Sequence, residues 1–176
     1  MVLVKPKTFP HRDADSLASG AIDILKSASV FKELSAAIQD ETLVYGLTAR
    51  DRHFALPVLT PRQAAEEILT KPQKTALLFG SENGGLLNEE LNFCHKIITI
   101  QTGNTYNSLN LAHAVSICLY ELRAALTVAP KITEQDGPEE IPISEIINLA
   151  DHFLEVMESV DFVKHRKIKL LPIPVL

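Results

Sequence analysis

The chain has 176 residues, of which 46% are hydrophobic, and its formal net charge is −5. That length can bury one sizeable core, and the negative balance provides no global positive field to attract nucleic acid. No apolar run approaches the roughly 20 residues of a membrane-spanning helix, and residues 1–6 are too short for a secretory signal. Two cysteines make no disulfide framework and no zinc pattern. We therefore expect a cytoplasmic protein without a metal site.

Short apolar runs alternate with helical periodicity along the chain, which predicts an α/β fold with a mainly parallel sheet. The predicted strands cover residues 2–4, 42–47, 75–79 and 96–100. The predicted helices run from a cap at Asp15 to Leu25, from Pro61 to about Leu69, and over residues 109–126. A last amphipathic helix, capped by Ser144, has an apolar stripe made of Ile146, Leu149, Phe153, Met157 and Val160.

The chain changes character near residue 127. Residues 128–142 are acidic and contain prolines, which indicates a linker. We therefore predict a main domain over residues 1–127 and a helical extension with a basic tail over residues 143–176. Four cations gather in that tail: Lys164, Arg166, Lys167 and Lys169. They form either a solvated helix end or a local contact for RNA phosphates.

Three loops follow the carboxyl ends of predicted strands, at residues 47–49, 80–86 and 100–109. In open α/β sheets, ligands bind at that edge. Glycines 80, 84 and 85 permit a flat ligand to approach the main chain closely, although a glycine turn alone is more often only a turn. A nucleoside triphosphate loop would continue with Lys-Ser/Thr, where this chain has Leu86 and Leu87. Nucleotide triphosphate binding is therefore disfavoured.

Polar side chains in two of these loops have both an ordinary and a functional interpretation. Glu82, taken alone, is a solvent-exposed acid, and Ser108 and Asn110 are suited to capping a helix. Their recurrence beside strand ends favours a ligand site, because main-chain N–H groups at a helix start can hold an anion or a carboxylate.

Two segments resemble motifs of a known family. "FGSENGGL" at residues 79–86 and "SLNLAHAVSICLYEL" at 108–122 are similar to motifs two and three of the SpoU (TrmH) family of SPOUT methyltransferases. "LTARDR" and "NTYNSLNLA" are closest to the TrmJ-type branch, which modifies the tRNA anticodon loop. The resemblance covers about residues 2–163. It implies S-adenosylmethionine-dependent methylation of ribose 2′-hydroxyls in tRNA or rRNA, a C-terminal trefoil knot and a homodimer.

The resemblance also implies roles for individual residues. The matching cofactor-binding positions are Leu47, Thr48, Ala49, Gly80, Ile100, Asn107, Ser108 and Leu109. The catalytic positions that it implies are Glu82, Ser108 and Asn110, which would orient the ribose and phosphate.

One family motif has no counterpart in this sequence. N-x-G-x-x-x-R, which supplies the arginine that acts on the ribose hydroxyl, is absent, and the alignment of motifs leaves out the family's first strand and helix. We therefore expect slow turnover or none, with Arg50 as the first candidate substitute. The alternative function is that of a cofactor-binding or RNA-binding homologue with little or no turnover.

Overall fold

The computed structural model describes residues 1–49, 56–70, 73–103, 108–128 and 141–159. The chain divides into two compact units, Met1–Asp40 and Glu41–Leu176. Both contain parallel strands and helices, so the predicted α/β class is confirmed. The trefoil knot and the domain limits at residues 127 and 142 stay predictions.

The first unit is built on two short parallel strands. β1 (Val2–Val4) pairs with β2 (Ser29–Phe31), and between them the chain forms α1 (Arg12–Ala18), η1 (Ser19–Ala21) and α2 (Ile22–Lys26). A further short helix, α3 (Leu34–Ala37), follows β2.

The single helix predicted over residues 15–25 is wrong. The first helix begins at Arg12, because Nδ1 of His11, and not the side chain of Asp15, accepts a hydrogen bond from the N–H of Asp13 at 3.3 Å. It ends at Ala18, because the φ of 49° at the next residue, Ser19, is incompatible with a continuous right-handed helix. Leu17 of this helix is 85% exposed, so its apolar side chain is not part of the core.

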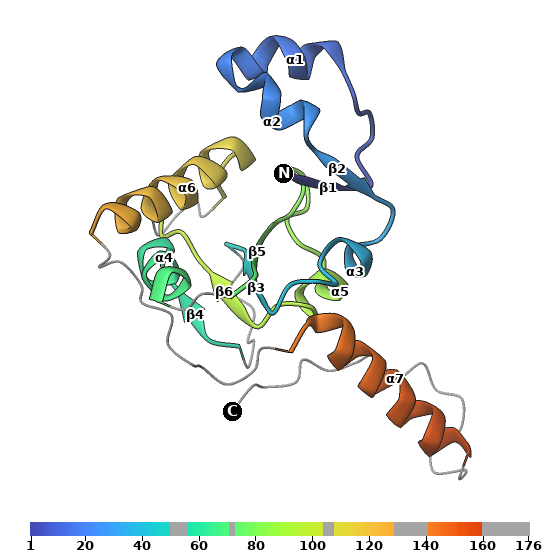
Figure 1. The fold of residues 1–176 in the computed structure, drawn as a ribbon. Helices are drawn as coiled ribbons and strands as arrows, with labels where there is room; N and C mark the ends of the chain where they lie inside the picture. The colour runs from blue at the N-terminus through green and yellow to red at the C-terminus, as the bar shows by residue number, and fades with distance from the viewer. Residues whose placement is uncertain (50–55, 71–72, 104–107, 129–140, 160–176) are drawn as a thin grey trace. The chain divides into compact units, whose positions relative to one another are not determined.

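The second unit contains a four-stranded sheet with the order β4-β6-β3-β5, and all neighbouring strands are parallel (Figure 1). The strands are β3 (Leu43–Leu47), β4 (Val58–Leu59), β5 (Thr75–Phe79) and β6 (Lys96–Ile98). Leu47 lies opposite both Phe79 and Ile98. The carboxyl ends of β3, β5 and β6 therefore stop at the same level, and the loops that follow them meet there.

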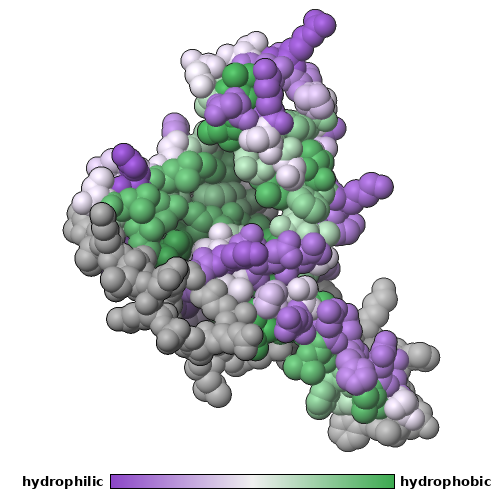
Figure 2. Space-filling view, viewed as in Figure 1, coloured by the Kyte–Doolittle hydropathy of each residue, from purple (hydrophilic) through white to green (hydrophobic). Residues whose placement is uncertain are grey.

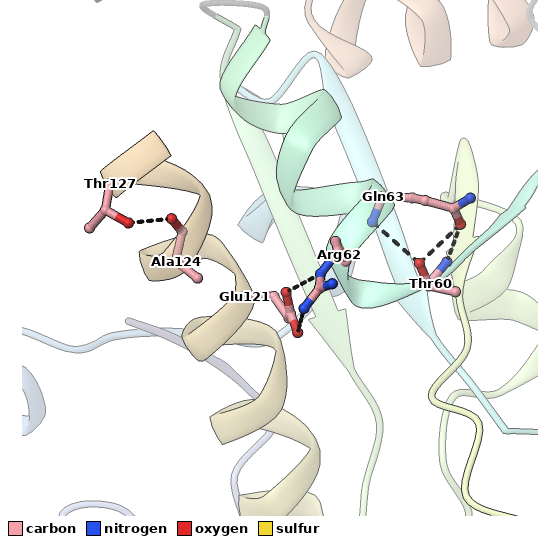
Figure 3. Close-up of polar contacts among 6 residues, drawn as sticks. All are labelled: Thr60, Arg62, Gln63, Glu121, Ala124 and Thr127. Atoms are coloured by element: carbon pink, nitrogen blue, oxygen red, sulfur yellow. Dashed lines mark hydrogen bonds and ion pairs between the residues drawn. The ribbon is translucent and has the colours of Figure 1, made fainter. Parts of the chain in front are cut away.

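Two helices, α4 (Pro61–Thr70) and α6 (Leu111–Val128), cover one face of this sheet and lie side by side (Figure 1). Ala64 of α4 and Cys118 of α6 are buried against Tyr45 and Ile98. An ion pair also joins the helices, since Nε of Arg62 donates to Oε2 of Glu121 at 3.1 Å (Figure 3).

The first turn of α4 is stabilised by a capping box, in which the side chain of each of two residues accepts a hydrogen bond from the main-chain N–H of the other. The N–H of Gln63 donates to Oγ1 of Thr60 at 3.3 Å, and the N–H of Thr60 donates to Oε1 of Gln63 at 2.9 Å (Figure 3). Pro61 occupies the first helical position, as predicted, where its missing N–H costs nothing.

The other face of the sheet requires a glycine in β3. A Cβ atom on Gly46 would stand 2.6 Å from Sγ of Cys94 and 3.2 Å from the side chains of Leu86 and Leu91. Leu91 ends the short helix α5 (Asn88–Leu91), so Gly46 permits this segment to pack directly on the strand. The close contact there explains why no larger residue fits.

The last described helix, α7 (Ile143–Ser159), is anchored at its first residue. Ile143 is buried, and its N–H donates to the carbonyl of Glu41 at 2.9 Å. Because α7 already includes Ser144, the predicted cap at that residue is wrong. Val160 and the basic tail lie outside the described residues. None of the described helices is both long and apolar enough to cross a membrane.

Candidate cofactor site

A cavity of about 340 Å³ opens where the carboxyl ends of β3, β5 and β6 meet the start of α6. Its volume lies at the lower end of the range of pockets for small organic ligands. The lining combines apolar walls, a polar turn and main chain. The residues are Leu47, Thr48, Ala49, Phe79, Gly80, Ser81, Glu82, Asn83, Gly84, Gly85, Ile100, Ser108, Leu109, Leu111 and Ala114.

The turn after β5 forms one wall of the cavity. The N–H of Gly85 donates to the carbonyl of Ser81 at 2.8 Å, and Gly85 has a φ of 61°, in the region that favours glycine. This closed turn places Glu82 and Asn83 at its tip. The carboxylate of Glu82 therefore stands at the edge of the cavity on a short, hydrogen-bonded loop.

Gly80 is required for this turn to fold back on itself. A Cβ atom there would lie 2.0 Å from the carbonyl carbon of Gly85 and 2.1 Å from the nitrogen of Leu86. Both neighbours are main-chain atoms, which cannot move aside by a change of rotamer as a side chain can. Any other residue at position 80 must therefore displace the wall of the cavity.

The loop after β3 is fixed to the neighbouring strand. The N–H of Thr48 donates to the carbonyl of Ile98 at 3.1 Å, and the carbonyl of Thr48 accepts from Oγ1 of Thr99 at 3.1 Å. Thr48 is the one buried polar residue found among the described residues. The floor of the cavity is thus an ordered segment of main chain.

The start of α6 supplies the third wall. Oδ1 of Asn110 accepts from the N–H of Ala112 at 2.9 Å, and the carbonyl of Asn110 accepts from the N–H of Ala114 at 3.0 Å. Asn110 is therefore the N-cap of α6. Its side chain is engaged in the helix and does not line the cavity, whereas Ser108 and Leu109, just before it, do.

The structure brings most of the predicted site residues together. Seven predicted cofactor-binding residues line the one cavity: Leu47, Thr48, Ala49, Gly80, Ile100, Ser108 and Leu109. Of the predicted catalytic residues, Glu82 and Ser108 line it. Asn107 and Arg50 lie outside the described residues. Sequence patterns did not point to Phe79, Leu111 and Ala114, because apolar residues within a predicted strand and helix carry no signal of a ligand site.

The titratable groups that burial affects most lie elsewhere. Burial raises the pKa of Cys94 to about 12 and that of Cys118 to about 11, and it also raises the pKa of Tyr45, with a smaller contribution from the charge of Glu67. None of these side chains lines the cavity. The cavity therefore offers main-chain groups, neutral polar side chains and one carboxylate for positioning a ligand.

A parallel sheet whose strand ends carry a glycine turn, an ordered main-chain floor and a helix start defines a ligand-binding α/β domain. A model of the SpoU rRNA Methylase family matches residues 1–120, which is more than half of the chain. The chain belongs to that family. The expected family and its TrmJ-like branch are therefore confirmed.

Two curated relatives illustrate the similarity. The TrmJ tRNA (cytidine/uridine/adenosine-2′-O-)-methyltransferase of Pseudomonas aeruginosa UCBPP-PA14 is 44% identical over 132 residues, which are 73% of this chain and 51% of that protein. The TrmJ tRNA (cytidine/uridine-2′-O-)-methyltransferase of Photorhabdus laumondii is 35% identical over 168 residues, which are 93% of this chain and 70% of that protein. The chain thus spans only part of the length of these relatives.

A solved structure supports the same grouping. The crystal structure of TrmJ from Z. mobilis ZM4 superposes with a TM-score of 0.80 at 31% identity, and covers 92% of this chain and 68% of that one. The fold that holds the cavity is therefore the fold of this relative.

Proposed function

We propose that this chain is an S-adenosylmethionine-dependent 2′-O-ribose methyltransferase that acts on tRNA, in the anticodon loop. The observation that carries the proposal is that the described residues of the three strand-end loops surround one shared cavity, in a chain of the SpoU family. Both relatives are named as tRNA 2′-O-methyltransferases, which supports tRNA over rRNA. A tRNA substrate in turn favours the cytoplasm as the place of action.

The residues of the cavity fit this cofactor. Leu47, Phe79 and Ile100 provide apolar walls for a flat ring, and residues 47–49 form its floor. When bound, S-adenosylmethionine supplies a methyl group on a positively charged sulfonium. The carboxylate of Glu82, at the edge of the same cavity, favours that positive charge.

We assign positioning of the ribose to Glu82 and Ser108, which line the cavity, with Asn110 fixing the start of α6 beside them. None of these groups is a strong base. The family's arginine motif does not occur in this sequence. Because groups that activate a hydroxyl typically contribute about 100-fold to 10,000-fold, we expect firm cofactor binding but slow methylation by the 176-residue chain.

The test combines a binding measurement with a single-turnover assay. Calorimetry should show binding of S-adenosylmethionine and of its demethylated product. An excess of protein is incubated for a long time with unmodified tRNA and S-adenosylmethionine. Mass spectrometry of the digested tRNA should then detect 2′-O-methylated nucleosides. A chain that binds the cofactor and leaves every ribose unmethylated would be a binding homologue only. A folded chain that does not bind the cofactor would remove the basis of the proposal.

We also propose that the chain forms a homodimer. Large apolar side chains are exposed on α6, namely Leu119, Tyr120 and Leu126, and on α7, namely Leu149, Phe153 and Val156. Figure 2 shows hydrophobic residues gathered over α6, and hydrophobic residues interspersed with hydrophilic ones along α7. An isologous contact would bury such a surface in both copies at once. Light scattering at micromolar concentration should give twice the chain mass, and replacing Leu119 and Tyr120 by Glu should give the monomer mass.

A further inference from the structure

Thr99, at the end of β6, makes a contact that no functional role yet explains. Its hydroxyl donates to the carbonyl of Thr48 at 3.1 Å, and its own N–H donates to the carbonyl of Leu59 at 2.9 Å. Thr99 does not line the cavity, but Thr48 does. The hydroxyl therefore contacts a residue of the cavity floor without itself lining the cavity.

This contact fixes the orientation of the peptide group between Thr48 and Ala49. The N–H and the carbonyl of Thr48 are both engaged by β6, through Ile98 and Thr99. In a trans peptide the carbonyl of one residue and the N–H of the next point in opposite directions. The only cis peptide bond found among the described residues is Phe9–Pro10. The N–H of Ala49 therefore points away from β6.

The side to which that N–H points is the side of β5, because β3 lies between β6 and β5 in the sheet. The pairing of β3 with β5 ends at Leu47 and Phe79, after which the chain turns away at Gly80 into the glycine turn. Within the part of the chain that the structure describes, no strand pairs with Ala49. Its N–H donates a hydrogen bond to none of the described residues, and Ala49 lines the cavity that the turn encloses.

We infer that Thr99 is a positioning residue of the cofactor site: its hydroxyl locks the peptide between Thr48 and Ala49 so that the N–H of Ala49 is held out to an acceptor atom of the cofactor. This inference rests on the proposed function. Without the hydroxyl, the peptide can rotate and the carbonyl of Thr48 loses its partner. The ligand would then have to reorder the peptide, which weakens binding.

Three variants of the full 176-residue chain test the inference. Thr99→Val keeps the shape of the side chain and removes the hydroxyl, and Thr99→Ser keeps the hydroxyl. The control is Thr42→Val, because Oγ1 of Thr42 donates to the carbonyl of Lys74 at the same distance of 3.1 Å, at the opposite end of the sheet. Calorimetry with S-adenosylmethionine and melting temperatures are measured for all of them.

We expect Thr99→Val to weaken cofactor binding by about three- to tenfold, the usual worth of one hydrogen bond. Thr99→Ser and Thr42→Val should bind like the parent chain. The amide signal of Ala49 in a ¹⁵N-correlated NMR spectrum should move on cofactor binding in the parent and in Thr99→Ser, and should move less in Thr99→Val. A purely structural role of the hydroxyl would lower the melting temperature and leave this signal unaffected.

The outcomes separate the two proposals. If the parent chain binds no cofactor, the proposed function fails. If the parent binds and Thr99→Val binds equally well, or if Thr42→Val weakens binding as much, the role of Thr99 is overturned while the proposed function stands. An Ala49 amide signal that the cofactor does not move also overturns it.

Discussion

The ammonium group of Lys96 on β6 forms an ion pair with the carboxylate of Glu67 on α4. Both side chains are largely withdrawn from water, with 27% and 23% of their surface exposed. Lys96 lies opposite Tyr45 of β3 in the register, so the pair ties α4 to the two strands that lead into the cavity.

Replacing Lys96 by Met should destabilise the fold, because the carboxylate of Glu67 would lose its cation in a half-buried place. We expect a loss of about 1–3 kcal/mol in the free energy of unfolding, measured in urea. The double variant Lys96→Met/Glu67→Leu should recover most of it, since an apolar pair of similar volume replaces a buried ion pair well. A single variant as stable as the parent would mean that water solvates Glu67 fully.

Unlike Lys96→Met, the variant Tyr45→Phe is not expected to destabilise the fold. The Tyr45 side chain is fully buried, and its hydroxyl has no hydrogen-bond partner among the described residues. After burial, the charge of Glu67 and a side-chain hydrogen bond with it also raise the pKa of this phenol, although no described partner of the hydroxyl meets strict hydrogen-bond geometry. Removing a buried hydroxyl that lacks a well-formed hydrogen bond should leave the unfolding free energy unchanged or raise it. A loss above about 1 kcal/mol would reveal a partner that the fold engages in solution.

Gly80→Ala should abolish cofactor binding, because even one methyl group at this position would overlap the main chain of Gly85 and Leu86. The matched control lies in the same turn. A Cβ atom on Gly84 would stand 3.7 Å from Oγ of Ser81, an ordinary contact, so Gly84→Ala should fold like the parent. Melting temperatures and calorimetry are read together. Normal binding by Gly80→Ala would show that the turn does not shape the cavity.

His95 should make the fold sensitive to acid. Its Nδ1 accepts from the N–H of Val44 at 3.1 Å, so this nitrogen carries no proton in the folded chain. Burial lowers the pKa of His95 below its ordinary value of 6.5. As the pH falls through 6.5 the unfolded chain binds the proton first, so this contribution to stability is present above that value and is lost at lower pH.

The variant His95→Asn separates this effect from general acid sensitivity. Its carbonyl oxygen can accept from Val44 in place of Nδ1, and it does not titrate. The slope of unfolding free energy against pH below 6.5 should therefore be smaller than in the parent. The control is His152→Asn, at an exposed position on α7. Equal slopes in the parent and in His95→Asn would rule out His95 as the sensitive group.

Local patterns in the sequence predict some elements of the fold and not others. The strand at 75–79 and the helix opened by Pro61 were predicted correctly, because a bounded apolar run and a capping proline are local signals. β2 and β4 were missed. β2 begins at Ser29 and lacks the continuous apolar run of β1, and β4 has only two residues. Both are recognised only by their pairing with β1 and β6.

In the candidate site, too, local patterns predict some features, and others depend on how the strands pair. That the loops would meet followed from the rule that parallel strand ends share an edge of the sheet, and the structure places residues of all three loops around one cavity. The contact of Thr99 with Thr48 depends on the register between β3 and β6, which no local pattern encodes. The two interpretations of Asn110, cap or catalytic group, could be weighed only once its amide oxygen was located.

Asn110 can now be tested for both roles at once. Asn110→Ala removes the cap of α6 and should lower the unfolding free energy by about 0.5–2 kcal/mol. Asn110→Ser restores a capping oxygen but not the amide, so it should be as stable as the parent. If Asn110 serves only to fix the helix start, the rate of tRNA methylation in single turnover should fall in the Ala variant and return in the Ser variant. A Ser variant with parental stability but a much lower rate would instead assign the amide a direct contact with the RNA.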